Sequence, residues 1–315
     1  MTNKIAFIFP GQGAQSVGMG KDIYENYESA KNVFDTADKI LGRSISGISF
    51  NGPEEDLKLT INTQPAIVTT SIALLEALKS ELNISHDYAA GHSLGEYCAM
   101  YSAGVMDLET TLKLIQKRAE LMGQTKGGAM AAVLNATEEQ LKAGLEQGSK
   151  VGYVDVANYN SPVQVVITGD ENAVKAASDY LLANGVRRVV PLAVSGAFHS
   201  KYMENAGADF AEFLNGYELN NAKLPVITNV DADETTLADE FKSKMPKQIY
   251  SSVHWTQTIQ KMISNGVDTF IEIGPGKILA GLNKKISSEI TTYNVYDKES
   301  LENTVNLLKE QLASV

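Results

Sequence analysis

The chain has a single cysteine, Cys98, among its 315 residues, so it cannot form an internal disulfide. Scarce cysteine suits a reducing compartment, and we expect a cytoplasmic protein. Positive charge is also in short supply, because 27 Lys and Arg stand against 38 Asp and Glu, for a formal net charge of −11. Binding to nucleic acid or to an anionic membrane surface needs clustered cations, so this balance argues against both partners.

Long apolar runs are missing as well. The opening stretch MTNKIAFIFP has only a short apolar run before Pro10, too short for the hydrophobic region of a signal peptide. No run approaches the roughly 20 residues that a membrane helix needs. Hydrophobic residues nevertheless make up 43% of the chain, which is ample for a packed core in one large domain or two. We therefore expect a soluble, intracellular, globular protein.

The succession of apolar and amphipathic stretches predicts an α/β fold. Buried strands are expected at residues 4–9 and just before residue 93, and again at 224–230 and 269–276. Helical spacing of apolar residues covers 20–41, 63–82, 94–105 and the C-terminal stretch 298–315. Alternation of strands with helices favours a parallel sheet.

The middle of the chain changes character after Gly127 and Gly128. Its pattern predicts a strand at 129–134, a helix at 137–148, strands at 151–160 and 163–169, a helix at 171–185 and a strand at 186–194. This β-α-β-β-α-β order is that of a ferredoxin-like unit. We predict a small ferredoxin-like domain at residues 129–197, inserted into a larger α/β domain made of residues 1–128 and 198–315.

The stretch Gly91-His92-Ser93-Leu94-Gly95 has the Gly-x-Ser-x-Gly pattern between an expected strand and an expected helix. In that context the pattern is typical of a nucleophile elbow, a sharp turn that exposes the serine oxygen. The helix start and the Leu94 amide would then face any negative charge that forms on a bound acyl group. Ser93 is the candidate nucleophile.

A serine nucleophile needs a base, and the chain has four histidines. His92 is adjacent to Ser93 and points elsewhere at a sharp turn, His86 precedes the strand, and His254 lies at an expected helix start. His199 lies in a loop of small residues where the chain leaves the predicted small domain, so it would face a cleft between the domains. We favour His199, although a lone loop histidine is more often simply exposed.

Other candidate residues are less sharply defined. Asp231 and Asp233 are possible orienting carboxylates, but their spacing does not distinguish them from ordinary loop aspartates. The turn PGQGAQ could supply a second oxyanion donor through Gln12, and it lacks the third glycine of a dinucleotide fingerprint. Arg118 lies on the flank of an apolar helix stripe, where it either reaches water or forms a buried fork for a carboxylate. Cys98 is expected to be a small core residue.

Taken together, several segments resemble one family, the malonyl-CoA:acyl-carrier-protein transacylases of bacterial type II fatty acid synthesis. The resemblance covers nearly the whole chain, in the family's order, and rests on FIFPGQGAQSVGMG, TQPAI, GHSLGEY, KRAELM, NYNSPVQVVITG, GAFHS and EIGPGKIL. It implies an α/β-hydrolase-like large domain with an inserted ferredoxin-like domain. It also implies transfer of a malonyl group from malonyl-CoA to holo acyl carrier protein.

The resemblance implies a role for each matching position. Ser93 would form a malonyl ester and His199 would be its base and later its acid. Arg118 would bind the free malonyl carboxylate. Gln12 and Leu94 would donate backbone amides to the oxyanion.

Two further positions follow from the resemblance. The backbone carbonyl of Gln248 would orient the histidine, which displaces the carboxylate suggested above and leaves a Ser-His dyad. Phe198 would fill the space that a branched malonyl group needs. One departure is visible, because Ser252 stands where the family often has proline in Pro-Val-x-Trp, and we expect a looser loop there.

Exchange between thioester and oxygen ester is nearly isoenergetic, so we expect no cofactor and no metal. Acidic carrier proteins would need a local positive patch on this acidic enzyme. Candidates near the cleft are Arg187, Arg188, Lys201, Lys277, Lys284 and Lys285. Three alternatives stay open on the sequence: a serine hydrolase with the same elbow, an inactive scaffold that kept the fold, and an acyltransferase domain cut from a modular polyketide synthase. The short ends favour a free-standing enzyme over the last.

Overall fold

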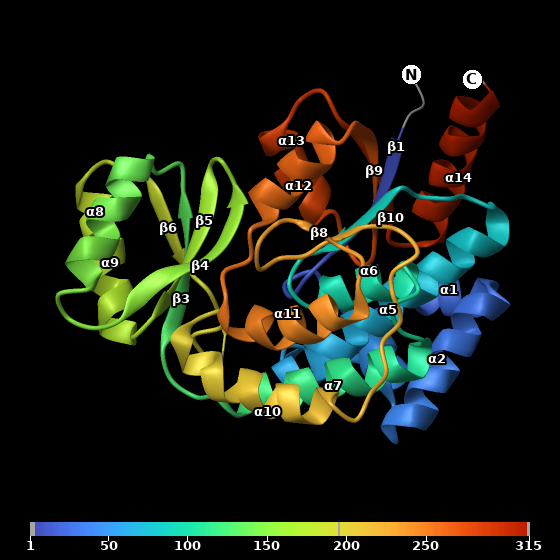
Figure 1. Cartoon of the computed structure of the whole chain (residues 1–315), viewed down its shortest axis with the longest axis horizontal. Coiled ribbons are helices and arrows are strands. Elements are labelled where there is room, and N and C mark those ends of the chain that lie inside the picture. The colour runs from blue at the N-terminus through green and yellow to red at the C-terminus, as the bar shows by residue number, and fades with distance from the viewer. Residues whose placement is uncertain (1–3, 195, 314–315) are drawn as a thin grey trace.

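The computed structural model describes residues 4–194 and 196–313, and it has two lobes, each built on its own sheet (Figure 1). The predicted α/β fold with a parallel sheet is confirmed. Residues 1–3, 195, 314 and 315 of the predicted domains lie outside the described residues.

The larger sheet has the order β10-β9-β1-β2-β7-β8. Its strands are β1 (Lys4–Phe9), β2 (Tyr88–Gly91), β7 (Val226–Ile227), β8 (Glu234–Thr235), β9 (Val267–Ile273) and β10 (Thr291–Val295). All neighbouring pairs are parallel except β7 with β8. The parallel strands end at one edge of the sheet, and the loops that follow β1, β2 and β7 meet there.

Both faces of this sheet are buried, which explains why β1 is apolar throughout. Ile5, Phe7 and Phe9 point into the core on one face, whereas Ala6 and Ile8 point into the core on the other. This is the alternation expected of a parallel strand covered by helices on both sides. Trp255 and its helix cover the second face.

The helices around the large sheet are more numerous than the sequence pattern suggested, and the expected helix at 20–41 is divided into α1 and α2. They are α1 (Lys21–Asn26), α2 (Glu28–Leu41), α3 (Ile45–Asn51), α4 (Glu54–Leu57), α5 (Thr60–Glu81), α6 (Gly95–Ser102), α7 (Leu108–Gln124), α10 (Glu204–Leu214), α11 (Ala238–Tyr250), α12 (Trp255–Ser264), α13 (Ile278–Ile286) and α14 (Lys298–Ala313). A short 3₁₀ turn, η1 (Lys201–Met203), precedes α10. None of the helices in the described part of the chain is long and apolar enough to cross a bilayer.

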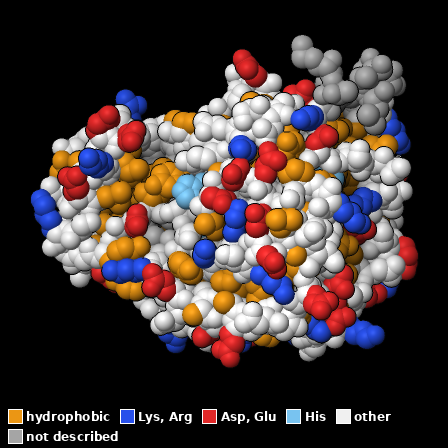
Figure 2. Space-filling model, in the orientation of Figure 1, with side chains coloured by type: hydrophobic (Ala, Val, Ile, Leu, Met, Phe, Trp, Pro, Cys, Tyr) orange, Lys and Arg blue, Asp and Glu red, His pale blue; other side chains and the backbone are white. Residues whose placement is uncertain are grey.

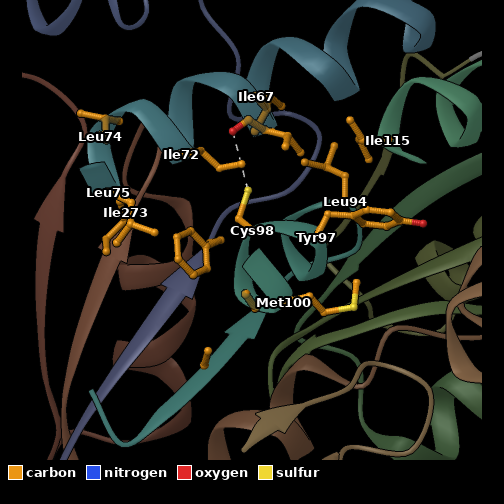
Figure 3. Packing of buried hydrophobic residues seen from close by; sticks show 14 of the residues in the cluster. Ile67, Ile72, Leu74, Leu75, Leu94, Tyr97, Cys98, Met100, Ile115 and Ile273 are labelled. Atoms are coloured by element: carbon orange, nitrogen blue, oxygen red, sulfur yellow. Dashed lines mark hydrogen bonds between the residues drawn. The ribbon is translucent and has the colours of Figure 1, made fainter. Parts of the chain in front are cut away.

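Cys98 lies in the middle of the main core, as expected for a small buried residue. Figure 3 shows it on α6, surrounded by side chains of α5 such as Ile72 and by Leu94 and Tyr97 of its own turn and helix. Its thiol points at the Val68 carbonyl, 3.8 Å away, and burial raises its pKa. The thiol is therefore a packing group with little thiolate character.

The smaller lobe is an antiparallel sheet of order β4-β5-β3-β6 with two helices on one face (Figure 1). Its elements are β3 (Ala129–Leu134), α8 (Glu138–Gly148), β4 (Val154–Ser161), β5 (Gln164–Gly169), α9 (Glu171–Ala183) and β6 (Arg188–Pro191). The chain enters and leaves the lobe side by side, since Gly127 pairs with Gly196. A groove of about 860 Å³ lies between α8 and the β4–β5 hairpin, and Ser93 is not among its lining residues.

Several element boundaries differ from the sequence expectation. Strand β7 is only two residues long because the chain turns away into the loop that carries Asn229. Strand β10 was not foreseen, since TTYNV carries polar residues at the edge of the sheet and has no clear apolar alternation. Edge strands bury one side only, so their sequence signal is weak.

Candidate active site

Ser93 lies in the sharp turn between β2 and α6, with a backbone φ of 51°. A positive φ is strained for a residue with a side chain, and such strain is found mainly at functional sites. The two glycines permit the turn, because a Cβ on Gly91 would lie 1.9 Å from the Gly95 carbonyl carbon and one on Gly95 would lie 2.3 Å from the Phe9 carbonyl oxygen. The geometry is that of a nucleophile elbow.

His199 lies in the loop that follows β6, the last strand of the small lobe, and this loop brings its side chain to Ser93. Ser93 Oγ and His199 Nε2 are 2.9 Å apart. His199 Nδ1 lies 3.0 Å from the Gln248 carbonyl oxygen and 3.1 Å from the Ser251 carbonyl oxygen. Because both carbonyls only accept, Nδ1 carries the proton and Nε2 is free to accept the proton of the Ser93 hydroxyl.

Arg118 does not reach water, so the interpretation that it reaches solvent is wrong. Its side chain is fully buried, and it donates to Gln64 Oε1 (2.7 Å), Ser93 Oγ (3.0 Å) and Gln248 Oε1 (2.9 Å). All three partners are uncharged, and the Arg118 Nε has no partner among the described residues. Burial lowers the Arg118 pKa. A guanidinium held in this way is a ready binding site for a carboxylate.

The electrostatics keep His199 neutral. Burial, and then the positive charge of Arg118, lower the His199 pKa to about 3. Ser93 is 9% exposed and His199 is 6% exposed, so the dyad is nearly closed to water. A carboxylate bound at Arg118 would cancel much of the guanidinium's effect and raise the His199 pKa toward its usual range.

Of the two amides expected at the oxyanion, that of Leu94 belongs to the elbow and that of Gln12 belongs to the loop after β1. This loop passes directly beside the elbow, because a Cβ on Gly11 would lie 2.6 Å from the His92 carbonyl oxygen. Within the described residues, neither the Gln12 amide nor the Leu94 amide donates to an acceptor in the chain. Both are therefore available to a ligand oxygen.

Comparison with known proteins places this geometry in a family. Residues 6–307 match the sequence profile of the acyl transferase domain. The chain is 44% identical to the malonyl CoA-acyl carrier protein transacylase of Bacillus subtilis (strain 168) over 313 residues, which cover 98% of each protein. The chain belongs to the acyl transferase family, among its malonyl-CoA:acyl-carrier-protein transacylases.

Solved structures of transacylases have the same fold. The crystal structure of the malonyl CoA-acyl carrier protein transacylase from Clostridium perfringens is 39% identical, with a TM-score of 0.94 over 99% of this chain and 100% of that one. A second structure, 34% identical with a TM-score of 0.93 over 96% of this chain and 99% of that one, is a malonyl-transacylase in complex with its type II polyketide synthase acyl-carrier protein.

The remaining histidines of this transacylase are structural. His92 contacts Asn160 Oδ1 of the small lobe through Nε2 (2.8 Å), and His254 stacks on Tyr159 with ring centroids 5.3 Å apart. His86 precedes β2 and stacks on Phe7 of β1, and burial lowers the His86 pKa to about 4. In Figure 2, a histidine side chain is visible at the surface where the two lobes meet.

Neither candidate carboxylate orients His199 in the transacylase. Asp231 pairs with Lys244 (2.7 Å) and Asp233 pairs with Lys261 (2.9 Å). Backbone carbonyls lie beside Nδ1 instead, including that of Gln248, by which the family resemblance had already replaced the possible carboxylate.

The sequence reasoning also missed three residues in the site. Gln64 holds Arg118, Ser251 shares the His199 proton, and Asn229 bonds to the elbow. Gln64 stands in the quoted TQPAI motif, which was the one available signal for it.

The small lobe is joined to the same segment that orients His199. The Ser252 hydroxyl donates to the Val156 carbonyl (2.6 Å), and the Val253 amide donates to the Ala157 carbonyl (2.8 Å). These bonds to β4 hold the loop before Trp255, where Ser252 stands in place of the proline that is frequent in the family. Phe198, 5% exposed, packs in the main core next to His199.

Proposed function

We propose that the protein is an [acyl-carrier-protein] S-malonyltransferase, which moves a malonyl group from malonyl-CoA to the phosphopantetheine thiol of holo acyl carrier protein in fatty acid biosynthesis. The family assignment supports the reaction. The single observation that carries the substrate is the buried guanidinium of Arg118, which lies 3.0 Å from the hydroxyl of Ser93 and whose hydrogen-bond partners in the described part of the chain are all neutral. An acyl group that reaches this serine and ends in a carboxylate would supply the missing negative charge.

In the first half-reaction, Ser93 Oγ attacks the thioester carbonyl of malonyl-CoA while His199 Nε2 takes its proton. The 2.9 Å contact between these atoms supports that transfer. The oxyanion of the tetrahedral intermediate would accept hydrogen bonds from the backbone amides of Gln12 and Leu94. Leu94 lies at the start of α6. Collapse of the intermediate expels the thiolate of CoA, which takes the proton from His199 and leaves a malonyl ester on Ser93.

In the second half-reaction, the thiol of the carrier's phosphopantetheine gives its proton to His199 and attacks the ester. Ser93 leaves with that proton, and the product is malonyl carrier protein. Each step exchanges one acyl bond for another, so we expect no cofactor or metal to be needed. Two half-reactions through one serine predict ping-pong kinetics. The low exposure of Ser93 and His199 supports protection of the ester from water.

Selectivity for malonyl over acetyl would come from Arg118. A hydrogen bond between charged groups contributes about 1.5–3 kcal/mol, which is a factor of about 10 to 150. An acetyl group would leave the guanidinium without a counter-ion. Phe198, buried beside His199, would occupy the volume that the methyl group of a branched malonyl requires.

We also propose that residues 129–197 form an inserted domain within 1–128 and 198–315, and that the enzyme works in the cytoplasm. The first proposal is supported by the separate sheet and core of the small lobe and by the adjacent entry and exit of the chain. The second is supported by the single buried cysteine.

For the carrier protein we propose a contact at Lys201. This exposed lysine is two residues from His199, and its Nζ lies 4.2 Å above the ring of Tyr153. Lys201→Glu should raise the KM for carrier protein and leave the KM for malonyl-CoA unchanged. The matched control is Lys175→Glu on the outer helix α9, where Lys175 pairs with Asp179. Equal carrier KM values for the two variants would reject this contact.

The test of the whole proposal is mass spectrometry after mixing with malonyl-CoA. We expect a malonyl increment on the peptide that contains Ser93, and no increment in Ser93→Ala. The ester should be discharged faster by holo carrier protein than by water. Rapid loss to water alone would indicate a hydrolase, and no increment on the wild-type serine would indicate an inactive scaffold.

A further inference from the structure

The side chain of Asn229 contacts the nucleophile turn from outside at two backbone groups. Its Oδ1 accepts the Ser93 amide (2.8 Å), and its Nδ2 donates to the Gly91 carbonyl (2.8 Å). The two bonds hold the peptide groups on either side of His92, directly before Ser93. A single amide group, in the loop that follows β7, thus fixes the backbone that leads into the strained residue.

Asn229 is itself fixed by another buried residue, Glu96 of helix α6. Its backbone amide donates to Glu96 Oε2 (2.6 Å), three residues after Ser93 on α6. Its backbone carbonyl accepts from the His254 amide (3.1 Å). Asn229 is fully buried and Glu96 is 1% exposed, so water cannot replace these partners.

The same amide is connected to the group that orients the base. Gln248 Nε2 donates to the Ser93 carbonyl (2.8 Å) and, more weakly, to Asn229 Oδ1 (3.3 Å). The Gln248 backbone carbonyl accepts from His199 Nδ1, and its Oε1 accepts from Arg118. The position of the serine relative to its base and to the guanidinium therefore depends on contacts that meet at Asn229.

We propose that Asn229 is a positioning residue that holds the strained turn of Ser93, with the Glu96 carboxylate fixing Asn229 in turn. Without its side chain, the Ser93 amide loses this acceptor and the Gly91 carbonyl loses this donor. The backbone would then relax from φ 51° toward an unstrained value and move the hydroxyl away from His199. A misplacement of about 1 Å in a reacting group can cost about 10²-fold in rate.

The inference rests on the proposed function for its nucleophile, but it is tested on serine reactivity without malonyl-CoA. The probe is diisopropyl fluorophosphate, whose phosphorus is attacked by an activated serine with loss of fluoride, and adduct formation on Ser93 is followed by mass spectrometry. The variants are Asn229→Ala, which removes both bonds, and Asn229→Asp, which keeps an acceptor for the Ser93 amide. The control is Asn283→Ala on α13, because Asn283 is equally buried and bonds to Thr292.

We expect Asn229→Ala to be labelled about 10²-fold more slowly than the wild type, Asn229→Asp to fall between them, and Asn283→Ala to keep the wild-type rate. In steady-state assays kcat should fall in the Asn229 variants while the KM for malonyl-CoA stays within about threefold. Melting curves of all variants fix the folded fraction to which each rate is normalised. If Asn229→Ala does not fold, the proposal is decided by Asn229→Asp, which should be labelled more slowly than Asn283→Ala.

Equal normalised labelling of the Asn229 and Asn283 variants would overturn the proposal, since a general loss of packing would then account for both. Labelling of the wild-type Ser93 by the fluorophosphate, without acylation by malonyl-CoA, would refute the malonyl transfer and leave the positioning role intact. A wild-type serine that reacts with neither reagent would remove the nucleophile and overturn both proposals.

Discussion

Replacing Arg118 with methionine isolates the charge that we assign to carboxylate binding. Methionine fills much of the volume of the arginine stem, so the fully buried site loses its guanidinium without a large cavity. The loss removes hydrogen bonds to Gln64, Ser93 and Gln248, but only a carboxylate substrate also loses an ionic partner. The expected result is a fall of about 10- to 150-fold in the preference for malonyl over acetyl.

The same substitution should change the pH dependence of acetyl transfer. Arg118 lowers the His199 pKa, so its removal raises that pKa. The base would then be protonated at a higher pH, and the acidic limb of kcat/KM would move upward. The assay is transfer of radiolabelled malonyl and acetyl groups from CoA to holo carrier protein, run from pH 4 to 8.

The matched control is Arg43→Met. Arg43 is a partly buried arginine whose guanidinium also donates to neutral groups, namely Asn62, Gln116 and the Ile61 carbonyl. It does not contact the Ser93 hydroxyl, so the ratio of malonyl to acetyl transfer should stay at the wild-type value. An equal loss of malonyl and acetyl transfer in Arg118→Met would refute the assignment of this residue.

Three further predictions concern the base, the elbow and stability. His199→Ala should slow acylation by about 10²–10⁴-fold in stopped-flow measurements, and an unchanged rate would remove it from the mechanism. Gly95→Ala should lower the free energy of unfolding by about 1–3 kcal/mol in urea titrations, because its Cβ would meet the Phe9 carbonyl. Burial raises the Glu272 pKa from 4.5 to about 7, so the folded state keeps a proton that the unfolded chain releases, and stability falls as pH rises between these values. Glu272→Gln should flatten that fall, by on the order of 3 kcal/mol, and an unchanged slope would contradict the raised pKa of Glu272.

The sequence predicted those parts of the site that depend on local geometry. The elbow could be recognised because Gly91 and Gly95 must lack side chains where β2 and α6 approach each other, and that requirement is written within five residues. Strand β1 was predictable for a similar reason, since a strand buried on both faces is apolar at every position. The elements of the small lobe followed from periodicity and from glycine and proline at their ends.

Contacts between distant segments could not be read in this way. Arg118 lies on the flank of an apolar stripe, and only the structure shows that this flank is closed to water, with Gln64 of α5 and Gln248 of α11 bonded to the guanidinium. The partner of His199 is the backbone of residues 49 and 52 positions away, and a backbone carbonyl leaves no signature in residue types. Asn229 stands two residues before Asp231, but an orienting group for a histidine was expected to be a carboxylate, so the amide side chain that bonds to the elbow was not considered.

The polar groups of the site share partners, and this sharing predicts that their effects will not add. The Gln248 side chain accepts from Arg118 and donates to the Ser93 carbonyl, so its removal breaks two contacts of the site at once, in the residue whose backbone carbonyl orients His199. Once Arg118 is removed, the Gln248 side chain has already lost one of its partners, and a second substitution there has less left to disturb. The double variant Arg118→Met with Gln248→Ala should therefore lose less malonyl transfer than the product of the single losses. Additive losses in that cycle would mean that the two residues act independently and that the shared network does not govern the position of the serine.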